Sequence, residues 1–175
     1  MADRLRGAVP RPHLDNIRCN DYYRGVRHEP LRSPRTQAQF KAFVAVVQAA
    51  EHMQRGVTEL LKKAHLTTAQ YNVLRVLRGA GADGLACGQV GERLIRHDPD
   101  VTRLVDRLAR RGCVVRTRER TDRRVVRTRI TERGLELLAS LDGPIDALHE
   151  EQLGYMSESQ LSELSSLLGR ASTEG

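Results

Sequence analysis

Residues 86–131 contain two short helical patterns followed by two alternating apolar runs, and this order constrains the fold more than any other feature of the sequence. In the first pattern, Val90, Leu94 and Ile95 can share one helix face. A break follows at residues 96–99, and the second pattern then places apolar residues at helical spacing, namely Val101, Leu104, Val105 and Leu108. Two helices joined by a short turn are typical of a helix-turn-helix motif, whose second helix is the recognition helix.

Capping residues mark the expected ends of the second helix. Asp98 is a favourable N-cap, and Pro99 suits the first helical position, where its missing N–H costs nothing. Gly112 is the expected C-cap. We therefore expect the recognition helix to span residues 99–111.

A β-hairpin with a basic tip is expected directly after this helix. Residues 113–118 and 125–130 are β-branched, alternating runs separated by residues 119–124. Val126, Thr128 and Ile130 are expected to point inward, with Arg127 and Arg129 on the opposite face. Leu85 could supply a short third strand. A helix-turn-helix followed by a basic hairpin is a winged helix.

Positive charge is concentrated in this part of the chain. Residues 103–129 contain eleven Arg and three acidic residues, a net charge of +8, whereas the whole chain carries +7. A solvated charged surface is the ordinary alternative for such a run. Here the charge is nearly all Arg, which suits phosphate and guanine recognition, and it lies on the expected recognition helix and wing. The pattern predicts binding to double-stranded DNA.

Composition excludes several other classes of protein. The 175 residues correspond to one ordinary domain or a domain with extensions, and few aromatics (Trp 0, Phe 2, Tyr 4) predict an aliphatic, helical core. The sequence has neither an apolar run of membrane-spanning length nor a recognisable secretory signal. Cysteines at positions 19, 87 and 113 lack the spacing of a zinc site, so we expect a reducing cytoplasm and no bound metal.

The flanking segments indicate the domain organisation. Residues 1–35 form a basic extension with four of the six prolines. Residues 36–65 form a helical region, in which a long helix over 37–64 is expected with Thr36 as its cap. Thr67 is expected to cap the next helix, whose core face carries Tyr71, Val73, Leu74 and Leu77. Residues 66–134 form the DNA-binding domain, and residues 135–175 form helices, with a kink or break at 142–144 and a capping box at 157–160.

Both helical ends carry apolar stripes that flank the expected DNA-binding unit. Residues 131–175 contain nine acidic residues and two Arg, so this end is not expected to lie on DNA. Apolar stripes on both sides of a DNA-binding unit predict that residues 36–65 and 135–175 pack against a second copy, giving a symmetric dimer.

The chain resembles the MarR family of bacterial transcriptional regulators. The matching pieces are LTTAQYNVL at 66–74, VTRLVDRL at 101–108, RG at 111–112, DRR at 122–124 and ITERG at 130–134, in the family's order and spacing over roughly residues 37–170. The resemblance implies a mainly α fold with a small β-hairpin wing (α+β) and a homodimer on a palindromic operator in the bacterial cytoplasm, at the nucleoid. It also implies a repressor that a small phenolic or other anionic ligand releases.

The resemblance also implies a set of DNA-contacting residues. Four residues at the start of the recognition helix would face the major groove, with a further arginine along the helix: Asp100, Val101, Thr102, Arg103 and Arg107. Gln89 would touch backbone phosphates. Asp122 would pair with a neighbouring Arg and hold the wing, and the wing arginines complete the set, with Arg123 or Arg124 in the minor groove: Arg118, Arg120, Arg123 and Arg124.

The sequence departs from the family pattern before the recognition helix. The family often has Ser or Thr where this chain has residues 97–100, and carboxylates near the groove repel phosphate. Asp98 is therefore better interpreted as a cap. Asp100 either pairs with Arg103 or accepts a hydrogen bond from a cytosine amino group.

Three further possibilities depend on other residues. An effector pocket, implied by the family, would use His52, Arg55, His65 and Tyr71, although each also fits a helix-surface or capping role. Cys87, near an expected helix N-terminus, could sense oxidants, although a structural thiol fits as well. The alternative within DNA binding is an architectural protein without sequence preference. The six scattered His form no catalytic or metal motif, so we expect neither an enzyme nor a cofactor.

Overall fold

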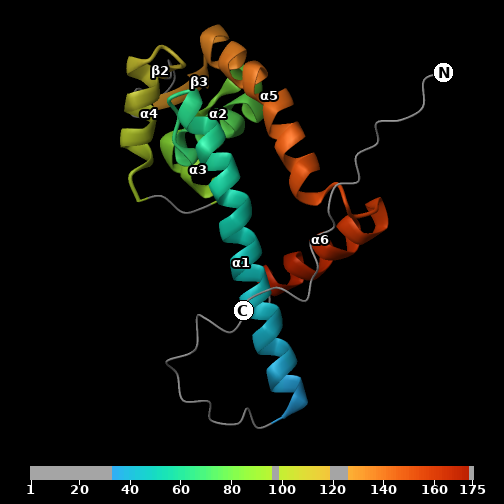
Figure 1. Ribbon diagram of the computed structural model, residues 1–175. Helices are drawn as coiled ribbons and strands as arrows, with labels where there is room; N and C mark the ends of the chain where they lie inside the picture. The colour runs from blue at the N-terminus through green and yellow to red at the C-terminus, as the bar shows by residue number, and fades with distance from the viewer. Residues whose placement is uncertain (1–32, 96–98, 119–125, 174–175) are drawn as a thin grey trace, which may run out of the picture. The chain divides into compact units, whose positions relative to one another are not determined.

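The computed structural model describes residues 33–95, 99–118 and 126–173 (Figure 1). In chain order, these residues form α1 (Pro34–Lys63), α2 (Thr68–Ala80), the 3-10 turn η2 (Gly81–Asp83), β1 (Leu85–Ala86), α3 (Cys87–Glu92), α4 (Val101–Arg110), β2 (Val114–Arg118), β3 (Val126–Ile130), α5 (Glu132–Leu153) and α6 (Glu158–Thr173). The mainly helical fold with a small antiparallel sheet is confirmed. None of the described helices combines the length and apolarity that a membrane span requires.

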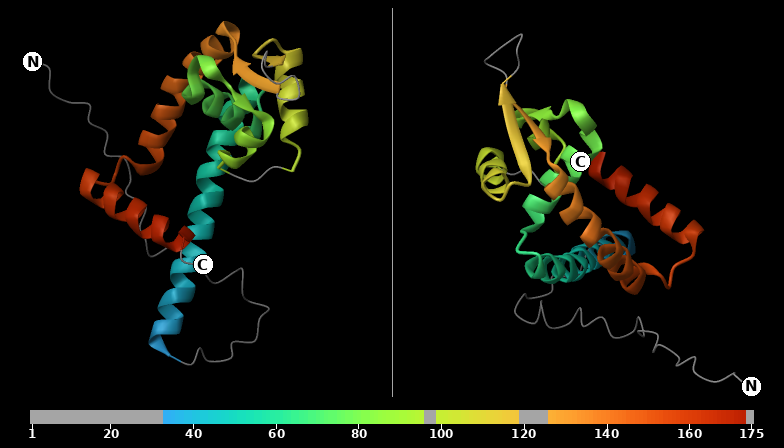
Figure 2. Two further views of the ribbon diagram at one scale, coloured as in Figure 1. Left: turned by 180° about the vertical axis from the view of Figure 1, so that it is seen from behind. Right: turned by 90° about the horizontal axis from the view of Figure 1, so that it is seen from above.

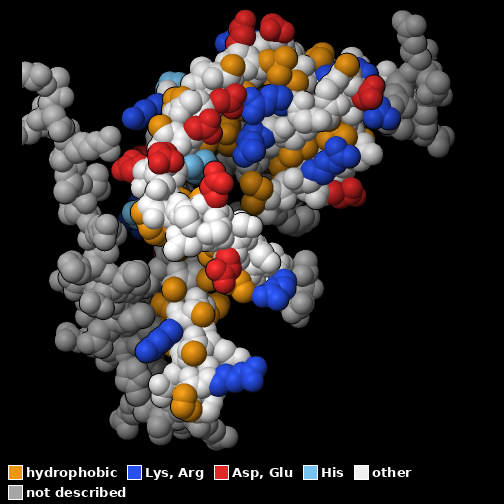
Figure 3. All heavy atoms as spheres, turned by 90° about the vertical axis from the view of Figure 1, so that its right-hand side faces the viewer, with side chains coloured by type: hydrophobic (Ala, Val, Ile, Leu, Met, Phe, Trp, Pro, Cys, Tyr) orange, Lys and Arg blue, Asp and Glu red, His pale blue; other side chains and the backbone are white. Residues whose placement is uncertain are grey.

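The chain divides into two units, Met1–Ala50 and Glu51–Gly175, with the boundary inside α1. In the first unit, Ser33 caps α1, because its hydroxyl accepts from the backbone N–H of Thr36 at 3.2 Å. The prediction that Thr36 caps this helix was wrong. Pro34 occupies the first helical position, so the cap is the residue before it, Ser33. This half of α1 has hydrophobic side chains at its surface, at the bottom of the view in Figure 3: Phe40, Phe43, Val46 and Val47.

In the second unit, a three-stranded sheet has the order β1-β3-β2 (Figure 2). Leu85 pairs with Thr128 and Val114 with Ile130, both antiparallel. The predicted hairpin and short third strand are thus confirmed. Thr128 points inward and is only 1% exposed, whereas Arg127 and Arg129 alternate with it and are half-buried.

An aliphatic core connects the sheet with the helices around it. The predicted inner face of α2 is confirmed by the burial of Tyr71, Val73, Leu74 and Leu77. These residues pack in one cluster with buried residues from α1, α3, α4 and α5, including Leu61, Val90, Val105, Leu108 and Leu138. The cap predicted at Thr67 is confirmed and is part of a capping box at the start of α2, with Gln70 N–H donating to Thr67 Oγ1 at 3.2 Å.

The first helix of the helix-turn-helix is shorter than predicted. α3 ends at Glu92, so Val90 is buried, Leu94 is half-buried, and Ile95 is 79% exposed. The expectation that Ile95 shares the buried face was wrong. The chain has already left the helix at Arg93, and helical periodicity no longer sets the direction of later side chains.

The recognition helix begins two residues later than predicted. α4 spans Val101–Arg110, and its N-cap is Asp100, whereas Pro99 lies in the preceding turn and Asp98 lies outside the described residues. The choice of Asp98 as N-cap was therefore wrong. Both aspartates have the chemistry of a cap, and only the backbone path selects Asp100. At the other end the C-cap is Arg111, and the predicted Gly112 follows it with φ +70, a conformation that glycine adopts without strain.

α5 continues through Pro144, where a kink or break was expected. A proline inside a helix removes one hydrogen bond and strains the preceding turn. Leu138, Leu141 and Ile145 are buried on the same helix face on both sides of Pro144, and this packing holds the helix together. The predicted capping box before α6 is present, since Gln160 N–H donates to Ser157 Oγ at 3.3 Å.

Candidate nucleic-acid interface

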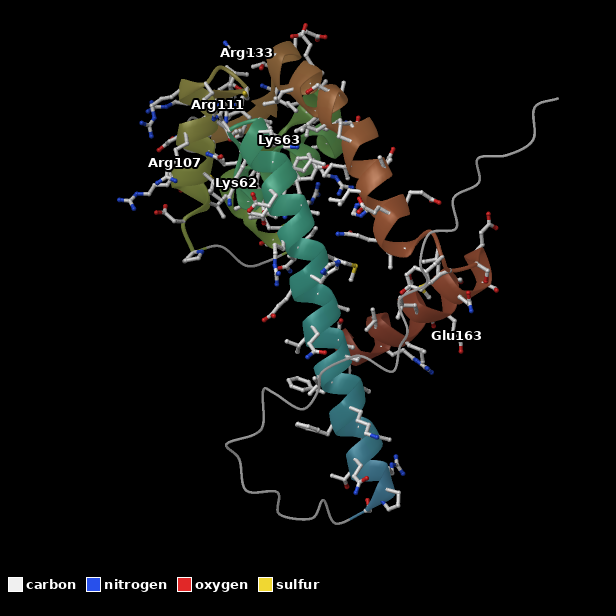
Figure 4. The ribbon with its side chains drawn as sticks, in the orientation of Figure 1. Lys62, Lys63, Arg107, Arg111, Arg133 and Glu163 are labelled. Carbon is white, nitrogen blue, oxygen red and sulfur yellow. The ribbon has the colours of Figure 1, made fainter. Side chains whose placement is uncertain are left out.

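α4 has one buried and one exposed face. Leu104, Val105 and Leu108 pack into the core, which fixes the helix against the sheet and α2. The opposite face is polar and carries the exposed residues Thr102, Arg103, Arg107 and Arg110. In Figure 4, the Arg107 side chain extends away from the body of the protein. This is the surface that a recognition helix presents to the major groove.

Asp100 and Arg103 are joined twice at the start of α4. Asp100 Oδ1 accepts from the backbone N–H of Arg103 at 3.2 Å, which closes the helix N-terminus. Asp100 Oδ2 lies 3.2 Å from Nε of Arg103. Of the two interpretations left open for Asp100, pairing with Arg103 is the one that the structure contains.

Internal bonds hold several arginines of the basic stretch. Arg116 pairs with Asp106 at 2.6 Å, and Arg111 donates to the carbonyl oxygens of His65 and Ala64 at 2.6 and 3.2 Å. Arg129 donates through Nε to the carbonyl of Ala82 at 2.6 Å. The sequence alone assigned all this charge to one surface, but these three guanidinium groups stabilise the fold.

Other arginines of the stretch remain without an internal partner. Arg107 and Arg110 on α4 and Arg118 at the end of β2 are exposed and make no hydrogen bond or ion pair with the described residues. Arg118 directly precedes the predicted tip of the wing. Residues Arg120, Asp122, Arg123 and Arg124 lie outside the described residues, and their roles stay predictions.

α3 provides two of the remaining predicted residues. Gln89 is exposed, and its side-chain oxygen accepts from the backbone N–H of Ala86 at 3.1 Å. Cys87 is half-buried at the first position of α3, with its sulfur 3.8 Å from Oγ1 of Thr102. The candidate thiol thus lies beside a predicted DNA-contacting residue.

The four predicted effector residues occupy different environments. Tyr71 is buried in the core, and the guanidinium of Arg75 lies 5.8 Å from its ring centre. His52, Arg55 and His65 are exposed. His65 has φ +55 and forms the turn whose carbonyl binds Arg111. The effector site therefore remains a prediction. Within the described ranges, no group of three or more His, Cys, Asp or Glu could hold a metal ion.

The structure contains an ion pair between α2 and α5 that the sequence did not predict. Asp142 lies in the middle of α5, where Arg78 donates to both of its oxygens at 2.8 and 3.1 Å. This hydrogen bonding with Arg78 holds the pKa of Asp142 below its usual value and raises the pKa of Arg78. Opposite charges 64 residues apart give no local sequence signal.

Comparison with known proteins places this chain among bacterial regulators. The MarR family model matches residues 66–125. The HTH-type transcriptional regulator MhqR of Bacillus subtilis (strain 168) is 28% identical over 131 residues, which is 70% of this chain and 89% of MhqR. A MarR transcription factor from Planctomyces limnophilus is 38% identical, with a TM-score of 0.59 over 74% of this chain and 93% of that one.

Bordetella bronchiseptica BpsR, whose DNA binding is regulated by 6-hydroxynicotinic acid, has the same fold. Its TM-score is 0.66 at 20% identity, covering 74% of this chain and 91% of BpsR. At this identity, the likeness concerns the fold alone.

Proposed function

This chain belongs to the MarR family of DNA-binding transcriptional regulators, and we propose that it is a homodimeric repressor of a palindromic operator in the bacterial cytoplasm. The observation that carries the proposal is a group of exposed arginines on α4 and β2 that have no partner among the described residues: Arg107, Arg110 and Arg118. Exposed like charges repel each other, and DNA phosphates would neutralise them.

The dimer would place two α4 helices in successive major grooves, with the wing arginines in the flanking minor grooves. Exposed apolar side chains in the segments outside the DNA-binding domain support this assembly. In the first unit Phe43 is 64% exposed, and in the second Tyr155 and Leu167 are 78% and 48% exposed. Residues 131–175 carry nine acidic residues and two Arg, so DNA would repel this end and a protein partner suits it.

An effector would act by changing the separation of the two recognition helices through a rigid-body movement. The DNA binding of BpsR, which has the same fold, is regulated by 6-hydroxynicotinic acid, a small aromatic acid. We propose the same class of ligand, a small anionic or phenolic compound, for this chain.

Selection of bound duplexes from random DNA at physiological salt tests the main proposal. An enriched inverted repeat supports a dimeric, sequence-specific regulator. Recovery of DNA without an enriched motif would contradict it and favour an architectural protein that binds any sequence. Sedimentation at micromolar concentration tests the dimer independently, and a monomer in the presence of operator DNA would contradict that part.

A thiol-controlled regulator is the second candidate, because Cys87 contacts Thr102 at the start of the recognition helix. Oxidation of the Cys87 sulfur would add polar bulk beside Thr102 and shift α4. This proposal predicts that peroxide abolishes operator binding in the wild type and leaves the Cys87→Ser variant unaffected. If both proteins respond equally to peroxide, Cys87 is a structural thiol.

A further inference from the structure

The pair formed by Asp100 and Arg103 does more than close a helix. Asp100 Oδ1 accepts from the backbone N–H of Arg103 at 3.2 Å, and Asp100 Oδ2 forms an ion pair with Arg103, 3.2 Å from its Nε. One carboxylate oxygen therefore binds the backbone of Arg103, and the other lies beside Nε of its side chain. The two terminal amino groups of Arg103 have no partner among the described residues, and its side chain is 76% exposed.

A carboxylate at this position has an electrostatic cost. Asp100 is the N-cap of the helix that approaches DNA, and its charge repels phosphate. Serine or threonine would cap the same helix without that repulsion. What Asp adds over Ser is a second acceptor that reaches the arginine side chain. An ion pair this exposed contributes at most about 1 kcal/mol to folding, so stability alone does not explain it.

We propose that Asp100 determines specificity by orienting Arg103 for recognition of a guanine in the major groove. With Nε held by Asp100, the two terminal amino groups of Arg103 donate together to O6 and N7 of one guanine, the commonest specific contact between arginine and DNA. Holding the side chain in advance lowers the conformational entropy lost on binding. This inference rests on the proposed function, because it requires a sequence-specific operator.

Exclusion of water at the interface strengthens this arrangement. An exposed pair is weak in solution, but its attraction grows when DNA covers it and lowers the effective dielectric constant. In contrast, direct recognition of a cytosine amino group by Asp100 would have to share a carboxylate oxygen with Arg103. Oδ1 already accepts from the backbone N–H of Arg103 and Oδ2 already pairs with its guanidinium, which favours guanine recognition by Arg103.

The same helix offers a matched control. Asp106 pairs with Arg116 at 2.6 Å, as Asp100 pairs with Arg103. The two carboxylates are almost equally exposed, at 46% and 48%. Asp100→Asn and Asp106→Asn each remove one negative charge from α4 and each leave one arginine without its acid. Non-specific attraction to phosphate thus rises equally in both variants.

The experiment compares base preferences of the full-length wild type, Asp100→Asn, Asp100→Ser, Asp106→Asn and Arg103→Lys by selection from random duplexes. Asn and Ser both retain an N-cap acceptor, and thermal melting checks that the fold is intact. We expect one guanine in each half-site to lose about tenfold of its preference in both Asp100 variants. Arg103→Lys should lose the same guanine, because lysine lacks the bidentate fork. Asp106→Asn should retain it.

If the wild type enriches a motif, either of two results would overturn the inference. In the first, the Asp100 and Asp106 variants have the same base preferences as the wild type. In the second, the base that depends on Arg103 is not guanine. If the wild type enriches no motif, the proposed sequence-specific function itself fails, which is a distinguishable outcome.

Discussion

Arg111 donates from Nη1 to the carbonyl oxygen of His65 at 2.6 Å and from Nη2 to that of Ala64 at 3.2 Å. One guanidinium thereby connects the residue that ends α4 with the turn that ends α1 (Figure 4). The carbonyl groups at a helix C-terminus lack intrahelical partners and carry partial negative charge, so a cation is favoured there. The end of the recognition helix is thus fixed to the long helix that precedes the DNA-binding domain.

Replacing Arg111 by Ala should lower the free energy of unfolding by about 1–3 kcal/mol, because charge-assisted hydrogen bonds to these carbonyl groups are lost. Urea denaturation measures this change. Arg110→Ala is the control, since Arg110 is the exposed neighbour without an internal partner, and it should change stability by less than about 0.5 kcal/mol. Equal effects of the two substitutions would contradict the role of Arg111.

The Arg78–Asp142 pair should make the free energy of unfolding depend on pH. Because Arg78 lowers the pKa of Asp142 in the folded state, the pair stabilises fully above the ordinary carboxyl pKa of 3.8. Its contribution is lost as pH falls through the depressed pKa. Asp142→Asn should therefore be less stable than the wild type at neutral pH and approach it once pH falls below the depressed pKa of Asp142. The difference should be about 1 kcal/mol or less, because both side chains are more than a third exposed. If the stability difference between the wild type and Asp142→Asn does not change with pH, the ionisation of Asp142 does not contribute to folding as proposed.

Gly134 allows α5 to begin against the sheet. A Cβ at this position would overlap the carbonyl oxygen of Cys113 and lie 2.7 Å from Cγ1 of Ile130. Gly134→Ala should destabilise the protein by about 1–3 kcal/mol through overpacking. Gly79→Ala in α2 is the matched control, because nothing lies within 4 Å of its Cβ. That change should stabilise by about 0.5–1 kcal/mol in thermal or chemical unfolding, and destabilisation of the same size at both sites would contradict the packing argument.

Arg107 should contribute to DNA affinity through charge. Replacing it by Ala should weaken binding to operator and to random DNA alike, and lower the slope of log affinity against log salt by about 1. Titrations at several salt concentrations measure both. Arg133→Ala removes the same charge from the start of α5 and should leave the slope unchanged (Figure 4). An unchanged slope for Arg107→Ala would place Arg107 outside the interface.

The wing prediction concerns Arg123 and Arg124. Either Arg123→Ala or Arg124→Ala should weaken operator binding by about 1–3 kcal/mol and flatten its salt dependence, because a narrow minor groove concentrates negative potential around the inserted arginine. Fluorescence anisotropy with a labelled operator duplex measures the loss. If neither substitution alters affinity, the assignment of the wing tip to the minor groove is wrong.

The sequence determined the elements whose signals are local. Apolar spacing predicted the inner face of α2, and the caps at Thr67 and Ser157 marked the helix starts correctly. Alternation predicted the hairpin and the inward direction of Thr128. These signals act between residues a few positions apart, so the order of helix, turn, helix and hairpin could be read directly from the chain.

Tertiary structure decided which partner each side chain takes. The sequence could not separate the arginines that stabilise the fold, Arg111 and Arg116, from Arg107, which remains available to DNA. It indicated Asp98 as the cap where the structure has Asp100, and it did not show that buried residues keep α5 continuous through Pro144. The physical reason is distance along the chain. Arg111 meets His65 across 46 positions and Arg78 meets Asp142 across 64, and only packing of the core brings such groups together.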